Sequence, residues 1–145
     1  ILESPKILKR IRMIRTMPHP GFPTDVQAQI MALTTVADGT SVIVENIFES
    51  RFKHIGELLR FGAKIHAEGR MAVVEGVHHL NGANVRATDL RGGSAMILAG
   101  LSARGTTEIT EIYHIDRGYE TPEKTLSELG ADIKRVNSNE KQGNA

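Results

Sequence analysis

The 145-residue sequence contains no cysteine. These residues therefore cannot form a disulfide framework, a zinc–thiolate site or a thiol nucleophile. A cysteine-free composition fits a reducing compartment, and we expect a cytoplasmic location. Aromatic residues are also scarce, at 4%. The basic segment 6–15 consequently lacks the interleaved rings of single-strand nucleic-acid binders, and a solvated strand face is the simpler interpretation.

Excess charge and long apolar runs are missing as well. The sequence has 18 Lys and Arg against 17 Asp and Glu, a formal net charge of +1. Such a balance gives no whole-chain field that would recruit nucleic acid or an anionic membrane. No apolar run approaches the roughly 20 residues that span a bilayer, and no leader pattern opens the chain. We expect neither nucleic acid nor membrane as a partner.

What is present is typical of one globular domain. Hydrophobic residues make up 40% and charged residues 24% of the chain, and the length suffices for a buried core. We expect one compact unit over residues 1–136 and a flexible polar tail over 137–145. Because the sequence opens with Ile1 rather than Met, we expect it to be a piece of a longer protein.

The first third of the chain predicts two strands and a helix. Residues 6–16 alternate apolar and basic side chains, which is the period of a half-buried strand. A proline-rich stretch, 18–23, then leads to a helix start at Thr24, where Gln27 fits a capping box. The β-branched run in 42–47 predicts the next strand.

A helix and a hairpin are predicted to follow. Leu58 and Leu59 belong to the apolar side of that helix, and Gly62 ends it. Two short strands, 64–67 and 71–75, flank a tight Glu-Gly turn. The predicted order is strand, helix, strand, helix and hairpin.

That order recurs along the chain. The string ADGTS at 37–41 returns as ARGTT at 103–107, an offset of 66 that also relates Arg51 to Arg117, and FGAKI at 61–65 returns as LGADI at 129–133. We expect two related units, about 6–76 and 77–136. In the second, the pattern predicts a helix over 91–103, a strand over 106–112 and a last helix opened by Thr121-Pro122.

Charged residues fall at corresponding helix starts in the two units. Asp25 and Arg91 are related by the same offset of 66, and helix N-termini favour anions. Asp25 is either a ligand for a substrate hydroxyl or an acid that only complements the helix dipole. Arg51, Arg91 and Arg117 have guanidinium groups that match phosphate oxygens, although each is also an ordinary surface arginine when taken singly.

Four longer strings carry a specific resemblance. They are PGFPTDVQAQ at 20–29, IFESRF at 47–52, ATDLR at 87–91 and YHIDRGYE at 113–120. In this order they resemble the C-terminal part of the UDP-N-acetylglucosamine 1-carboxyvinyltransferases, over about residues 6–136. The resemblance implies an α/β fold, the inside-out barrel of the enolpyruvyl transferases, of which this chain would be two βαβαββ units.

The resemblance also implies an activity and a site. These enzymes transfer the enolpyruvyl group of phosphoenolpyruvate to the 3′-hydroxyl of UDP-N-acetylglucosamine, the first committed step of peptidoglycan precursor synthesis, without a metal or other cofactor. By motif match Asp25 binds the reacting hydroxyl and is its proposed base, and Arg117 meets phosphoenolpyruvate. Ile47 offers a backbone contact to the nucleotide sugar, and the same cleft is lined by Arg51, Asp89 and Arg91.

The cysteine that donates a proton in many members of that family is absent from this chain. We therefore expect the missing N-terminal part of the same enzyme to supply it, and the isolated chain to be inactive. Two alternatives remain open: a transferase like 5-enolpyruvylshikimate-3-phosphate synthase, and a module that binds a nucleotide sugar without turnover.

Overall fold

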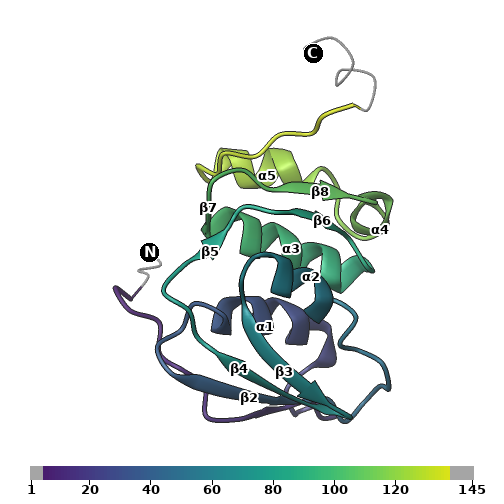
Figure 1. Cartoon of the computed structure of the whole chain (residues 1–145). Helices are drawn as coiled ribbons and strands as arrows, with labels where there is room; N and C mark the ends of the chain where they lie inside the picture. The colour runs from purple at the N-terminus through teal and green to yellow at the C-terminus, as the bar shows by residue number, and fades with distance from the viewer. Residues whose placement is uncertain (1–4, 138–145) are drawn as a thin grey trace.

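The structure, a computed structural model, describes residues 5–137 of the chain as a mixed α/β fold (Figure 1). The predicted tail lies, from residue 138 on, outside the described residues. In chain order the elements are β1 (Ile14–Arg15), the 3₁₀ turn η1 (Thr24–Val26), α1 (Gln27–Thr34), β2 (Thr40–Val44), α2 (Ile55–Arg60), β3 (Lys64–Glu68), β4 (Met71–Glu75), β5 (Leu80–Asn81), β6 (Asn84–Arg86), α3 (Leu90–Ser102), β7 (Ala103–Arg104), β8 (Glu108–Thr110), α4 (Tyr113–Asp116) and α5 (Pro122–Glu128).

The first half of the chain builds a four-stranded sheet in the order β1-β2-β4-β3. β1 pairs parallel to β2, whereas β2, β4 and β3 pair antiparallel. The predicted hairpin of 64–67 and 71–75 is confirmed as β3 and β4, with Lys64 opposite Glu75. Alternate side chains of β2 and β4 are buried, among them Ile43 and Val74, so the sheet turns one face to the core.

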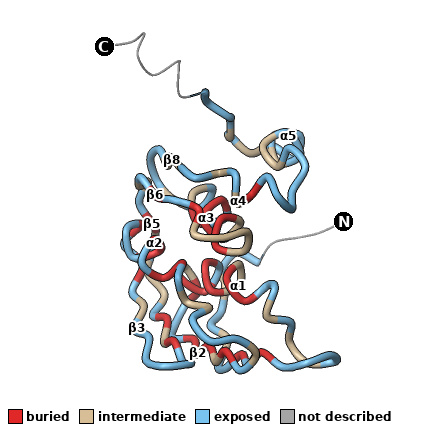
Figure 2. The backbone as a smooth tube through the Cα atoms, turned by 90° about the vertical axis from the view of Figure 1, so that its right-hand side faces the viewer, coloured by how far each residue is buried: buried red, intermediate tan, exposed pale blue. Residues whose placement is uncertain are grey.

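The second half contributes short parallel ladders, in which β5 pairs with β7 and β6 pairs with β8. In Figures 1 and 2 these strands and the four-stranded sheet lie toward the outside, and the helices α1 and α3 lie between them. Burial in Figure 2 is accordingly concentrated along the two helices and the inner face of the sheet.

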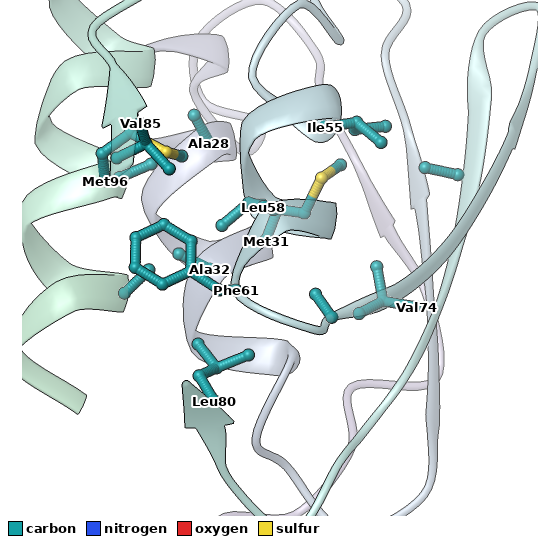
Figure 3. Close-up of a cluster of buried hydrophobic side chains, with 14 of the residues drawn as sticks. Ala28, Met31, Ala32, Ile55, Leu58, Phe61, Val74, Leu80, Val85 and Met96 are labelled. Carbon is teal, nitrogen blue, oxygen red and sulfur yellow. The ribbon is translucent and has the colours of Figure 1, made fainter. Parts of the chain in front are cut away.

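The core is an apolar cluster shared by both halves of the chain (Figure 3). Met31 of α1, Leu58 of α2 and Met96 of α3 are fully buried in it, as are Phe61 and Leu80. Because side chains from the sheet and from three helices meet here, the two halves pack as one body. No helix within residues 5–137 is long and apolar enough to cross a membrane.

Glycines that mark the sequence repeat share a backbone conformation. Gly39 and Gly105 have φ angles of 101° and 90°, and Gly62 and Gly130 have 85° and 95°. These are left-handed values that favour glycine over residues with a Cβ atom. The division into units 6–76 and 77–136 remains a prediction.

Three local predictions were wrong. The first strand is confined to β1 and two isolated bridges, from Lys9 to Asp38 and from Thr16 to Phe22. Thr24 caps no helix; its hydroxyl instead donates to the Glu45 carboxylate at 2.9 Å. Leu59 is 46% exposed, because α2 buries only one narrow side.

The neighbours Leu58 and Leu59 allow a matched test of this core. Leu58 is 0% exposed, so we expect Leu58→Ala to lower the free energy of unfolding by about 2–5 kcal/mol, through lost burial and the cavity left behind. Leu59→Ala removes the same atoms from a half-exposed position and should cost less than about 1 kcal/mol. Urea titration of both variants measures the difference. Equal losses would contradict the assigned orientation of α2.

Candidate active site

The starts of α1 and α3 lie side by side and are joined by an ion pair. Arg91, in the first turn of α3, contacts the Asp25 Oδ1 atom through both Nε and Nη2 at 2.5 Å. One turn further along, the Gln29 Nε2 group of α1 donates to the Ser94 hydroxyl of α3 at 2.8 Å. The two helices therefore run parallel, and residues 66 positions apart in sequence meet at their N-terminal ends.

Asp89 is the N-cap of α3. Its Oδ1 atom accepts hydrogen bonds from the backbone N–H groups of Arg91 and Gly92, both at 2.9 Å. Burial raises the pKa of this carboxyl, but the hydrogen bonds from Gly92 and Arg91 and the nearby His54 and Arg51 side chains outweigh burial and lower the pKa. Asp89 is thus held ionised at a helix N-terminus, where a negative charge is favoured.

His54 lies behind this helix start and was not identified from the sequence. Its side chain is 1% exposed, and its Nε2 atom has no hydrogen-bond partner within residues 5–137. Burial lowers the pKa of His54 to about 4, against the opposing effects of the Asp89 charge and a hydrogen bond to the Arg51 backbone. A Cβ atom at Gly92 would lie 3.3 Å from the His54 Cβ and 2.3 Å from the Thr88 hydroxyl, so glycine permits this close approach.

Arg51 and Ile47 lie on the loop between β2 and α2. The Arg51 guanidinium stacks on the Phe48 ring at 4.1 Å from the ring centroid, a cation–π contact that fixes a long side chain. The Ile47 N–H group donates to Glu45 Oε1 at 2.9 Å. The end of this loop lies close to the start of α3, because a Cβ atom at Gly92 would lie 3.3 Å from the Cβ of His54, the residue that precedes α2.

Glu45 is a second residue that sequence reasoning missed. It directly follows β2, continues the inward alternation of Ser41 and Ile43, and is 1% exposed. Burial raises the pKa of Glu45, but hydrogen bonds from Thr16, Thr24 and two backbone N–H groups outweigh burial and lower it. The signal was present in the sequence, because a charged residue at an inward position of a strand requires buried partners.

Arg117 follows α4 and has an exposed side chain. Its neighbour Gly118 packs on the first residue of α3, since a Cβ atom there would lie 2.7 Å from the Leu90 side chain. Arg135 fixes the end of α4 by a bidentate contact to Asp116 at 2.7 and 3.0 Å. The guanidinium of Arg117 makes no hydrogen bond or ion pair in the described part of the chain, whereas its backbone N–H group donates to the Ile115 carbonyl.

The structure thus joins three of the predicted residues directly. Asp25, Asp89 and Arg91 form one connected cluster at the adjoining helix starts, and Arg51 lies on the neighbouring loop, whose last residue His54 approaches Gly92 of α3. Ile47 belongs to the loop that carries Arg51, and Arg117 to the segment that packs on α3. Guanidinium groups beside two helix N-termini suit a phosphate or carboxylate, and an exposed carboxylate suits a hydroxyl donor.

Comparison with known structures identifies the class of protein. The enolpyruvyl transferase NikO from Streptomyces tendae aligns with a TM-score of 0.82 and 30% sequence identity, over 90% of this chain and 30% of that chain. EPSP synthase from Acinetobacter baumannii aligns with a TM-score of 0.58 and 23% identity, over 77% of this chain and 26% of that chain, and supports the fold alone. The expected enolpyruvyl transferase fold is confirmed.

The family follows from the sequence comparison. The model of the EPSP synthase (3-phosphoshikimate 1-carboxyvinyltransferase) family matches residues 3–140, and the chain belongs to this family.

Within the family, the resemblance to UDP-N-acetylglucosamine 1-carboxyvinyltransferases is confirmed. The enzyme of that name from Geobacter metallireducens is 66% identical over 123 residues, 85% of this chain and 30% of the relative. The one from Caldanaerobacter subterraneus subsp. tengcongensis is 62% identical over 122 residues, 84% of this chain and 29% of the relative. The chain therefore spans about 30% of the length of these curated relatives.

The buried His54 predicts a specific dependence of stability on pH. In the unfolded chain this histidine binds a proton as the pH falls through about 6.5, whereas in the folded chain it does so only near pH 4. Protonation therefore favours the unfolded state in this window, and we expect His54 to cost about 2 kcal/mol of stability between pH 7 and pH 5.

The measurement is the free energy of unfolding in urea at both pH values for the wild type, His54→Gln and His66→Gln. The difference between wild type and His54→Gln should shift by that amount in favour of the variant at pH 5. His66→Gln, which alters an exposed histidine of β3, should follow the wild type. A difference that does not change with pH would argue against burial of the imidazole.

Proposed function

We propose that this chain is part of a cytoplasmic enzyme that transfers the enolpyruvyl group of phosphoenolpyruvate to the 3′-hydroxyl of UDP-N-acetylglucosamine. The observation that carries the proposal is the meeting of Asp25, Asp89 and Arg91, from two separate family strings, at the starts of α1 and α3, beside the loop that carries Arg51. Identities of 66% and 62% to relatives named for this acceptor support the choice of nucleotide sugar. The reaction would be the first committed step of peptidoglycan precursor synthesis.

The reaction assigns a role to each group. The sugar hydroxyl oxygen bonds to C2 of phosphoenolpyruvate while C3 gains a proton, and the adduct then loses phosphate and a proton from C3. Asp25 accepts the hydrogen bond of the reacting hydroxyl and takes its proton, while Arg91 fixes the carboxylate in place. Arg117 and Arg51 bind the phosphate and carboxylate groups of phosphoenolpyruvate. Ile47 contacts the nucleotide sugar through its backbone.

The acid that protonates C3 belongs to another part of this enzyme. These 145 residues contain no cysteine, and the chain spans about 30% of its relatives' length. A second candidate acceptor is a shikimate phosphate, because the matching family model is described as EPSP synthase. Assays with each acceptor in turn distinguish the two candidates.

Titration of UDP-N-acetylglucosamine against the purified chain tests the acceptor site. We expect Asp25→Ala to weaken binding roughly 10- to 100-fold, because a hydrogen bond to a charged group contributes roughly 1.5–3 kcal/mol. The matched control is Asp38→Ala, since the Asp38 side chain is also 65% exposed and is paired with Lys9 at 3.0 Å. Unchanged affinity in Asp25→Ala would count against Asp25 as a ligand.

Phosphate release tests the catalytic claim. The chain alone, given both substrates, should release none above background. A hybrid in which the chain replaces the matched 123 residues of the Geobacter metallireducens enzyme should release phosphate with UDP-N-acetylglucosamine as acceptor. Turnover by the isolated chain would refute the need for further residues, and an inactive, folded hybrid would refute the assigned reaction.

A further inference from the structure

The Glu45 carboxylate is a buried junction of four hydrogen bonds. Its Oε1 atom accepts from the Thr16 hydroxyl at 2.8 Å, the Ile47 N–H at 2.9 Å and the Phe48 N–H at 3.2 Å. Its Oε2 atom accepts from the Thr24 hydroxyl at 2.9 Å. Both oxygens are thus occupied by donors, as a carboxylate that is only 1% exposed requires.

These four donors come from three separate segments of the chain. Thr16 ends the first strand segment and also accepts the Asn46 N–H at 2.8 Å. Thr24 directly precedes Asp25 in η1. Ile47 and Phe48 open the loop whose Arg51 guanidinium stacks on the Phe48 ring. One carboxylate therefore links the turn that carries Asp25 to the loop that carries Ile47 and Arg51.

The chemistry of this link argues for a purpose beyond stability. A buried carboxylate loses its hydration, and apolar side chains of similar volume often stabilise a core as well as a buried charged group does. A carboxylate whose two oxygens both accept hydrogen bonds fixes the directions of several donors at once, and an apolar side chain cannot do this. Here three of those four donors belong to the two segments that hold predicted ligands.

We propose that Glu45 is a positioning residue that holds the Asp25 turn and the Ile47–Arg51 loop in one fixed relation, so that both contact the same nucleotide sugar. Its effect on binding rests on the proposed function. The coupling between the two segments does not, and it can be measured without any ligand.

The coupling is tested on the full chain by backbone amide NMR. Thr24→Val removes one donor to Glu45 and leaves the carboxylate in place. If Glu45 couples the segments, the Ile47 and Phe48 amide signals shift although the substitution lies more than 20 positions away in sequence. Signals of the β3–β4 hairpin should not move. Unmoved Ile47 and Phe48 signals would overturn the proposal, whatever the chain binds.

Binding is tested by titrating UDP-N-acetylglucosamine against Glu45→Gln and Thr24→Val, with affinity expressed per folded molecule. We expect at least a 10-fold loss for Glu45→Gln and a smaller loss for Thr24→Val. Glu75→Gln is the control, because Glu75 is an exposed glutamate of β4 that pairs with Lys64 of β3 at 3.0 Å. It should bind as the wild type does.

A purely structural role would give a different result. It would lower the free energy of unfolding and the folded fraction while leaving the affinity per folded molecule unchanged, and this outcome would overturn the proposal. If Glu45→Gln does not fold, Thr24→Val decides by the same criterion. A wild-type chain and hybrid that both fail with UDP-N-acetylglucosamine would refute the proposed function, and the NMR result would still decide on the coupling.

Discussion

Close packing of two parallel helices is the constraint on which the rest of this structure depends. α1 and α3 each carry buried alanines four positions apart, Ala28 and Ala32 on one helix and Ala95 and Ala99 on the other. Residues four apart share a helix face, and such small side chains let another element approach closely. The sheet and the short strand ladders then cover the pair from outside (Figure 1). Because the helices run parallel, both of their N-termini emerge at the same end.

That arrangement has an electrostatic consequence. Each helix N-terminus carries a partial positive charge, so two of them side by side repel each other and favour anions. Asp89 places a negative charge at the N-terminus of α3, where it is the N-cap. Asp25 lies at the start of the other helix and pairs across to Arg91. The charged residues of the site are therefore not independent of one another. The two adjoining helix N-termini favour acidic side chains at this end of the helix pair.

The sequence predicted those features that depend on neighbouring residues and missed those that depend on distant ones. The hairpin of β3 and β4 and the proline-opened helix α5 follow from local turn and capping chemistry, and both are present. The capping role predicted for Thr24 was wrong, because its hydroxyl finds a buried carboxylate 21 residues away. His54 carried no local signal, since α3, which approaches it at Gly92, is almost 40 residues away in sequence. The offset of 66 was the exception, because it related Asp25 to Arg91, and these two residues form an ion pair in the structure.

The Arg117 guanidinium has neither an ion pair nor an aromatic ring against it within residues 5–137. Arg91 is matched by Asp25, and Arg51 lies near the ionised Asp89 and stacks on Phe48. Asp116 is the acid nearest in sequence, yet Arg135 occupies it through both guanidinium nitrogens Nη1 and Nη2, and Glu123 is tied to the same arginine. Within residues 5–137 the guanidinium of Arg117 consequently stays unpaired, on a segment that packs against the start of α3. An exposed guanidinium whose neighbouring acids are already occupied is free to pair with an incoming anion, which agrees with the role that the proposed function gives to Arg117.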